Sequence, residues 1–182
     1  VFDYSADFLA LTGPVLLAVG VLLAAGRPVV RGPRVVAWPV TAGACLAVAG
    51  SLLLPYLSDR AVDDAYEASA AGRGDDAVDD ASRARDLDPL SLRARYAQAD
   101  VAGDDAAALA ALEGATGLQP ENADTWYQLG LYRYSFAAEP DACAAYFALN
   151  RAYTLDPVSR RWSKGGVLDR ARDEVNAGAC ER

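Results

Sequence analysis

The sequence contains no histidine and no methionine, and only three cysteines among its 182 residues. Histidine is the side chain that most often acts as a general base near neutral pH, and it is the commonest metal ligand, so its absence removes most hydrolase triads and zinc sites. The sequence also has no CxxC pair, GxGxxG loop or P-loop. We therefore predict no catalytic residue, no metal site and no cofactor. Because the chain begins with Val1 instead of Met, we expect further sequence upstream.

Basic residues are scarce in the second part of the chain. Residues 58–182 carry 14 basic and 23 acidic side chains, a net charge of −9, whereas residues 1–57 have a net charge of +1. Binding to nucleic acid requires clustered Lys and Arg, so this balance argues against nucleic acid as a partner. We interpret the acidic surface as one that keeps this part of the chain soluble.

Charged residues are absent from two long apolar runs near the start of the chain. The runs cover residues 8–26 and 35–57 and contain 19 and 23 residues. A helix needs about 20 apolar residues to cross the hydrocarbon core of a bilayer, so both runs predict transmembrane helices that contact membrane lipid. The loop between them, residues 27–34, contains three arginines, which the positive-inside rule places in the cytoplasm. Residues 58–182 are then expected outside the cytoplasm.

Prolines divide residues 58–182 at nearly regular intervals. Each follows an apolar residue and a polar one, in the segments Leu87–Pro89, Leu118–Pro120 and Leu155–Pro157. The prolines are 31 and 37 residues apart, which brackets the 34-residue period of tetratricopeptide repeats. In the last interval, Trp126, Leu129 and Gly130 match the W-x2-L-G pattern of that repeat. The pattern therefore predicts helix–turn–helix units.

The repeats predict three helix pairs and a capping helix. The expected pairs are residues 59–71 with 75–86, 90–102 with 104–117, and 122–137 with 140–154, and the cap covers residues 167–177. The predicted fold is thus all-α, with a two-span transmembrane segment in residues 1–57. An α-solenoid of tetratricopeptide-like helix pairs follows in residues 58–182.

Tyrosines recur on the first helices of these pairs, which line the concave face in solenoids of this type. Tyr96 and Tyr127 occupy equivalent positions in successive repeats, and Tyr134 lies two turns beyond Tyr127. Phenolic rings can stack on a sugar or hold a peptide, so the three tyrosines are candidate binding residues. The alternative is that they pack between repeats. Trp126 is at the consensus core position, and we interpret it as structural.

Two cysteines lie near the C-terminus, at helix ends that the predicted fold brings together. Cys143 starts the second helix of the last pair, and Cys180 follows the capping helix. The cap should return along the preceding helix, so these cysteines can form a disulfide, and an oxidising compartment would favour it. Two free thiols are the alternative.

The order of these features resembles the C-terminal end of bacterial O-antigen ligase / O-antigen polymerase family membrane proteins with a tetratricopeptide domain. The segments FDYSADFLALTGP, residues 2–14, and NRAYTLDP, residues 150–157, carry much of the resemblance. It implies a GT-C type glycosyltransferase of the bacterial inner membrane that acts on undecaprenyl-linked glycan. The family's chemistry is attributed to Arg and His in large loops that this chain lacks, so no catalytic residue carries over and enzyme status stays open.

The resemblance implies that residues 58–182 form a scaffold for an acceptor glycan or a protein partner. The alternative is a stand-alone, membrane-anchored tetratricopeptide adaptor that recruits peptides or proteins to a cell-envelope assembly.

Overall fold

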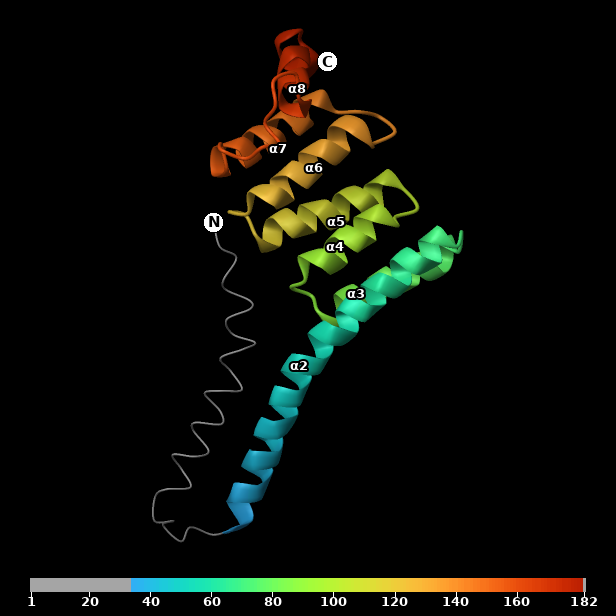
Figure 1. Ribbon diagram of the computed structural model, residues 1–182, viewed down its shortest axis with the longest axis vertical. Helices are drawn as coiled ribbons and strands as arrows, with labels where there is room; N and C mark the ends of the chain where they lie inside the picture. Colours follow the sequence, from blue (N-terminus) through green and yellow to red (C-terminus); the bar gives the residue numbers. More distant parts are fainter. Residues whose placement is uncertain (1–33, 182) are drawn as a thin grey trace. The chain divides into compact units, whose positions relative to one another are not determined.

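The computed structural model describes the backbone of residues 34–181 and the side chains of residues 50, 51 and 53–180. All regular elements in this part of the chain are helical (Figure 1). The chain divides into two compact units, Val1–Leu57 and Ser58–Arg182. The helices are α2 (Arg34–Ala70), α3 (Gly74–Leu87), α4 (Leu92–Asp100), α5 (Asp105–Leu118), α6 (Ala123–Ser135), α7 (Ala142–Leu155) and α8 (Val167–Asn176), followed by the 3-10 helix η1 (Ala179–Glu181).

The apolar run at residues 35–57 is part of α2, and α2 does not end with that run. It continues through Asp59, Arg60 and Asp63 to Ala70, so one helix joins an apolar half to a charged half. Within residues 34–181, no helix is long and apolar enough to cross a membrane. The other predicted span, residues 8–26, lies outside the described residues.

The fold class predicted from the sequence is therefore wrong in its membrane part. The absence of charge over 23 residues identified an apolar stretch of the right length, but α2 carries charged residues in its last turns and buries part of that half in the second unit. The two-span segment is not supported. The predicted location in the bacterial inner membrane depended on these two spans, and so did the placement of residues 58–182 outside the cytoplasm. Both predictions are withdrawn together with the spans.

Local sequence signals explain where the helices of the second unit begin and end. Polar residues cap four helices by accepting a backbone N–H of the first turn at 2.8–3.2 Å. These residues are Ser91, Asp104, Asn122 and Asp141. Helices α3, α5 and α7 each end two residues before a proline, because proline disfavours helical geometry in the residue preceding it. The helices from α3 to α8 thus lie within a few residues of the predicted ranges, whereas the predicted helix 59–71 is the end of α2.

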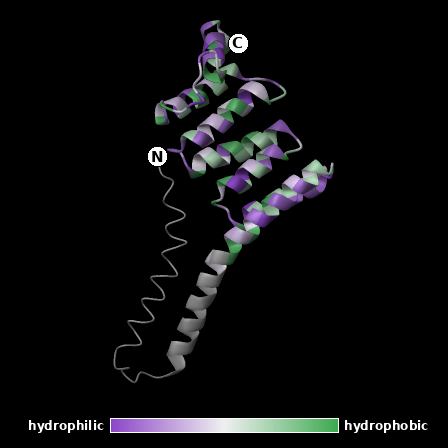
Figure 2. Cartoon of the chain, viewed as in Figure 1, coloured by the Kyte–Doolittle hydropathy of each residue, from purple (hydrophilic) through white to green (hydrophobic). Residues whose placement is uncertain are grey.

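Helices α3 to α8 pack against one another in chain order. Figure 1 shows α4, α5, α6 and α7 stacked side by side, and Figure 2 shows polar and apolar residues mixed along each of them. The first helices of the successive pairs are the end of α2, α4 and α6. Residues from these three helices line one shared face of the second unit.

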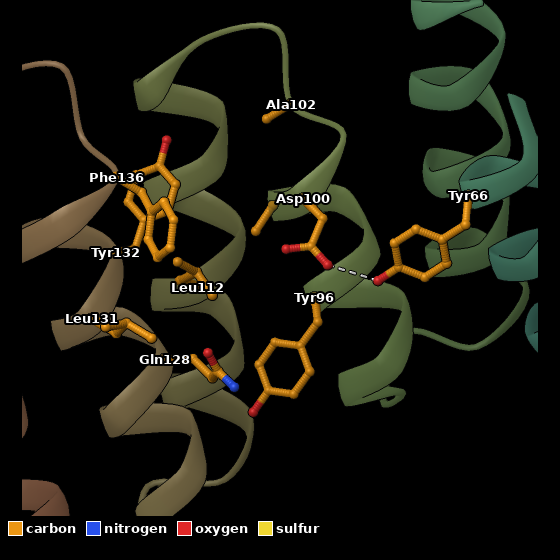
Figure 3. Close-up of a pocket in the computed structure, with 10 residues that line it drawn as sticks. Tyr66, Tyr96, Asp100, Ala102, Leu112, Gln128, Leu131, Tyr132 and Phe136 are labelled. Carbon is orange, nitrogen blue, oxygen red and sulfur yellow. Dashed lines mark hydrogen bonds between the residues drawn. The ribbon is translucent and has the colours of Figure 1, made fainter. Parts of the chain in front are cut away.

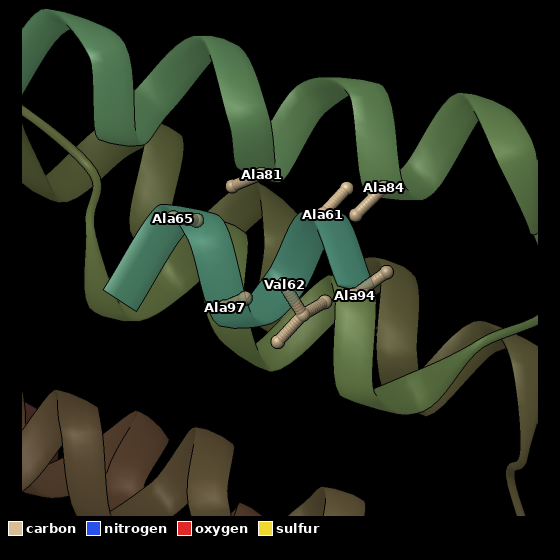
Figure 4. Close-up of a cluster of buried hydrophobic side chains, with 7 residues drawn as sticks. All are labelled: Ala61, Val62, Ala65, Ala81, Ala84, Ala94 and Ala97. Atoms are coloured by element: carbon tan, nitrogen blue, oxygen red, sulfur yellow. The ribbon is translucent and has the colours of Figure 1, made fainter. Parts of the chain in front are cut away.

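Three clusters of buried side chains form the core of the second unit. The first core cluster contains Ala61, Val62, Ala65, Ala81, Ala84, Ala94 and Ala97, contributed by α2, α3 and α4 (Figure 4). The second core cluster contains Ala99, Ala108, Ala111, Leu112, Leu129 and Ala148. The third core cluster contains Leu149, Val167, Leu168 and Ala171. Small residues therefore dominate where α2 meets α3 and α4, and larger ones where α7 meets α8.

Gly130 allows α6 and α7 to approach closely. A Cβ atom at this position would lie 2.7 Å from Cγ of Leu149 and 3.1 Å from the carbonyl oxygen of Ala145. Both distances are too short for a side chain to be added without movement of α7. The glycine of the W-x2-L-G pattern is thus explained by helix contact.

A disulfide joins Cys143, at the start of α7, to Cys180 in η1, with a Cα–Cα distance of 5.1 Å. It ties the segment after α8 back to the last helix pair. A cross-link of this kind stabilises a fold by about 2–4 kcal/mol, mainly because it restricts the unfolded chain.

Candidate functional site

A pocket of about 510 Å³ opens on the face formed by α2, α4 and α6 (Figure 3). Its volume falls within the range of small-ligand and side-chain sites. The residues lining it are Tyr66, Tyr96, Ala99, Asp100, Ala102, Leu112, Gln128, Leu131, Tyr132 and Phe136. We call this the tyrosine pocket.

Hydrogen bonds to carboxylates hold two rings of the tyrosine pocket. The Tyr66 hydroxyl donates to Oδ2 of Asp100 at 2.7 Å, and the Tyr96 hydroxyl donates to Oδ2 of Asp124 at 3.3 Å. Burial, followed by the neighbouring carboxylate, raises the pKa of both phenols above its ordinary value. Both hydroxyls therefore stay protonated near neutral pH, and each links one helix of this face to the next.

Tyr132 and Phe136 form the opposite wall of the tyrosine pocket, with ring centroids 6.4 Å apart. The Tyr132 hydroxyl donates to Oδ1 of Asp105 at 2.7 Å, and Oδ2 of the same carboxylate accepts the backbone N–H of Ala138 at 2.6 Å. Burial and Asp105 raise the pKa of Tyr132 to about 12. The two hydrogen bonds lower the pKa of Asp105, with that from Tyr132 contributing most. Asp105 thus anchors this wall to the loop after α6.

Asp100 is the only charged residue among the described residues that line the tyrosine pocket. It makes no ion pair with any described residue. Arg93, on the same helix, is already paired with Asp59 at 3.0 Å and with Asp63. The tyrosine pocket therefore combines aromatic walls with one negative charge that lacks a cationic partner within the described chain.

The structure does not bring the three predicted tyrosines into one site. Tyr96 lines the tyrosine pocket. Tyr127 instead packs edge-on against Trp162 with ring centroids 5.7 Å apart, and the Arg161 guanidinium lies 4.6 Å from the centre of its ring. Tyr127 therefore packs against the segment between α7 and α8 and does not line the tyrosine pocket.

Tyr134 also contacts the C-terminal segment. Its hydroxyl donates to Oε1 of Glu174 at 2.7 Å, which raises the pKa of Tyr134, and the Arg170 guanidinium lies 5.6 Å from its ring centre. Both of its partners belong to α8. Trp126 donates from Nε1 to the carbonyl oxygen of Pro120 at 2.8 Å and packs against the second core cluster, which fits the structural role expected of it.

The repeat spacing contains a signal for pocket residues that the sequence analysis missed. Tyr66 and Gln128 are 62 residues apart, twice the 31-residue spacing between Pro89 and Pro120. Asp100 and Leu131 are separated by one such spacing. The spacing thus relates these pairs, although Ala97, midway between Tyr66 and Gln128, is buried in the first core cluster. Phe136 follows the end of α6, where no repeat pattern applies.

Within the described part of the chain, no group of three or more Cys, Asp or Glu side chains is placed so that it could bind a metal ion. The chemistry that the tyrosine pocket offers is noncovalent: stacking on aromatic rings, hydrogen bonding to the Gln128 amide, and attraction of a positive charge to Asp100.

Comparisons with known proteins do not assign this chain to a family. No protein-family model matches the chain, and no curated protein matches it. The resemblance to O-antigen ligases and polymerases therefore stays a prediction from the sequence.

Proposed function

We propose that residues 58–182 act as a scaffold that binds an extended segment of a protein partner along α2, α4 and α6. In this proposal, a cationic side chain of the partner, from lysine or arginine, enters the tyrosine pocket. The cation lies against the rings of Tyr66 and Tyr96 and close to the carboxylate of Asp100.

The observation that carries the proposal is the composition of the pocket wall. Rings from three successive first helices surround a volume of about 510 Å³, and Asp100 is the one charged group described in its lining. A cation over an aromatic face gains about 0.5–2 kcal/mol, depending on how fully it is desolvated. The carboxylate adds a Coulomb attraction of the same sign. A neutral or anionic side chain would gain neither.

The pocket walls are also held in place before any partner arrives. Tyr66, Tyr96 and Tyr132 each donate a hydrogen bond to a carboxylate on another element. Ordering side chains upon binding costs free energy, so rings that are already fixed lower that cost. This preorganisation supports a binding role and requires no catalytic residue.

An acceptor glycan, the occupant that the sequence resemblance implies, is the second candidate. Gln128 offers an amide donor and acceptor beside the rings of Tyr96 and Tyr132, a combination suited to a sugar. The unpaired charge on Asp100 favours the cationic peptide, because neutral sugars would leave that charge without a counter-ion.

Selection of displayed random peptides on the full chain tests the proposal. Enriched peptides should contain a lysine or arginine, and in nuclear magnetic resonance titrations they should shift the signals of Tyr66, Tyr96 and Gln128. The variant Asp100→Asn keeps the shape of the side chain and removes its charge, so it should weaken binding about fivefold.

Asp79→Asn is the matched control, because Asp79 is exposed on α3 and does not line the pocket. It changes the net charge equally and should leave the affinity unchanged. Peptides that bind without shifting the pocket signals would overturn the proposal. Neutral oligosaccharides that shift those signals more strongly than any peptide would favour the glycan.

A further inference from the structure

A second pocket, of about 270 Å³, lies on a different face of α4, between α3 and α5. Its polar lining consists of Ser82, Arg85, Arg95 and Gln98, and the rest of its lining is alanine, valine and glycine. The described lining thus contains two arginines and no Asp or Glu. We call it the arginine pocket.

Arg95 is partly buried, and its guanidinium lies beside α5. Its side chain is half-buried on α4, and its Nη1 atom would lie 3.1 Å from a Cβ atom added to Gly114 of α5. The absence of a side chain at Gly114 therefore leaves room for the guanidinium beside α5. Gly117, one turn further along α5, has open space around it.

The Arg95 guanidinium has unused hydrogen-bonding capacity. Its Nε atom is buried and has no hydrogen-bond partner within the described residues. No carboxylate of those residues pairs with it. Other arginines of the unit do pair, for example Arg133 with Glu113 at 2.6 Å, but the feature that distinguishes Arg95 is that its unpartnered Nε is buried. Burying a guanidinium without a counter-ion costs free energy, and a bound anion would offset that cost.

We infer that the arginine pocket binds an oxyanion, a carboxylate or a phosphate group, with Arg95 as its main ligand. A guanidinium presents parallel N–H donors that match two oxygens of such a group. Arg85 adds a second positive charge, although its Nη2 also pairs with Asp86 at 2.7 Å. Ser82 and Gln98 supply further hydrogen-bond donors at the same pocket. Its lining shares only Ala102 with that of the tyrosine pocket, and the site goes beyond the proposed function.

The test titrates the isotope-labelled full chain with sodium phosphate and with sodium acetate, each against sodium chloride at matched ionic strength. We expect saturable shifts of the Arg95 Nε–H signal and of the backbone amide of Gln98, which chloride does not reproduce. Saturation by acetate would show that a carboxylate suffices. Saturation by phosphate alone would identify a phosphoryl group as the ligand. Shifts that are equal in all three salts would overturn the inference.

Two variants sharpen the test. Arg95→Gln removes the charge and should weaken oxyanion binding roughly tenfold or more. Gly114→Ala retains every charge but displaces the guanidinium, so it should also weaken binding, whereas Gly117→Ala on the same helix should not. Undiminished binding by Arg95→Gln, or equal binding by the two glycine variants, would contradict the inference. Circular dichroism of each variant checks that the helices remain folded.

Discussion

The first and third core clusters, at opposite ends of the second unit, are built from different side chains. The first contains six alanines and Val62, whereas the third contains Leu149, Val167, Leu168 and Ala171, with Tyr127, Tyr134 and Trp162 packed against it. Small side chains let helices approach closely, but each of them buries little apolar area. Burial of apolar area stabilises a fold by about 25 cal/mol per Å², so a cluster of alanines contributes less than a cluster of larger side chains. Stability is therefore expected to rise from the α2–α4 end towards the α7–α8 end.

Polar contacts do not offset this expected difference in stability between the two ends of the second unit. At the α2–α4 end, the Ser58 hydroxyl donates to the Ala84 carbonyl at 2.8 Å, and Arg93 pairs with Asp59. Both side chains of that ion pair are about half exposed, at 48% and 55%, and exposed pairs contribute little. The α7–α8 end has a disulfide in addition to its larger core. In stacked-helix proteins such differences act locally, because each unit contacts only its neighbours.

The largest expected effect comes from truncating one buried side chain in each cluster. Leu149→Ala should cost about 2–5 kcal/mol of unfolding free energy, because Leu149 is fully buried between α6, α7 and α8. Val62→Ala removes less volume and should cost about 1–3 kcal/mol. Denaturant unfolding with residue-level hydrogen exchange measures both. An equal cost at the two sites would contradict the proposed gradient.

Removing the disulfide should have the next largest effect. The double variant Cys143→Ser with Cys180→Ser should lose about 2–4 kcal/mol. Faster hydrogen exchange should be confined to α7, α8 and η1, while the first core cluster stays unchanged. Wild-type protein in a reducing agent serves as the control and should show the same pattern. Faster exchange in α2 and α3 would mean that the two ends unfold together.

Glycine substitutions test the close contact between α6 and α7. Gly130→Ala should destabilise the protein by about 1–3 kcal/mol, because the added Cβ would overlap with Leu149. Gly117→Ala, in open space on α5, should stabilise it by about 0.5–1 kcal/mol through its better helix propensity. Thermal unfolding of the two variants compares them directly. Similar shifts of the same sign would show that packing at Gly130 does not limit stability.

The smallest effect concerns pH and the Tyr132–Asp105 contact. The pKa of Tyr132 is raised from 10.0 to about 12, so its contribution to stability is present below pH 10.0 and is lost as the pH rises through about 12. The pKa of Asp105 is lowered from 3.8, so its contribution is present above pH 3.8 and is lost at lower pH.

Tyr132→Phe should therefore differ most from wild type between these limits, and the two proteins should converge outside them. Thermal unfolding across the pH range measures this difference, and Tyr134→Phe, which affects the contact with α8, is the comparison. A constant difference at all pH values would indicate lost packing and not a lost hydrogen bond.

Much of the second unit could be predicted from the sequence, because its helix boundaries depend on local chemistry. Prolines two residues past α3, α5 and α7 and capping residues such as Asp104 and Asp141 act within a few residues of their own positions. The W-x2-L-G pattern identified the repeat that contains Gly130, whereas the close contact of Gly130 with Leu149 is seen only in the structure. The disulfide, one of two alternatives in the sequence, followed from the return of the capping segment along α7.

The predictions that failed or stayed incomplete depended on long-range packing. Apolar length alone predicted a membrane span at residues 35–57, but the run is one end of a helix whose charged half belongs to the second unit. Repeat register placed Tyr96 and Tyr127 together, yet Tyr127 and Tyr134 contact the segment that follows α7. Where that segment packs is decided by contacts with residues far away in the chain.

By itself, the sequence determined an all-helical second unit with defined helix ends, small residues at helix contacts and an excess of acidic side chains. These properties are set by each residue and its close neighbours. Only the tertiary structure decided that Asp100 lies beside Tyr66 without a cationic partner and that Arg95 lies against Gly114 without an acidic one. Pairing of charges depends on which helices meet, and that is a property of the packed chain.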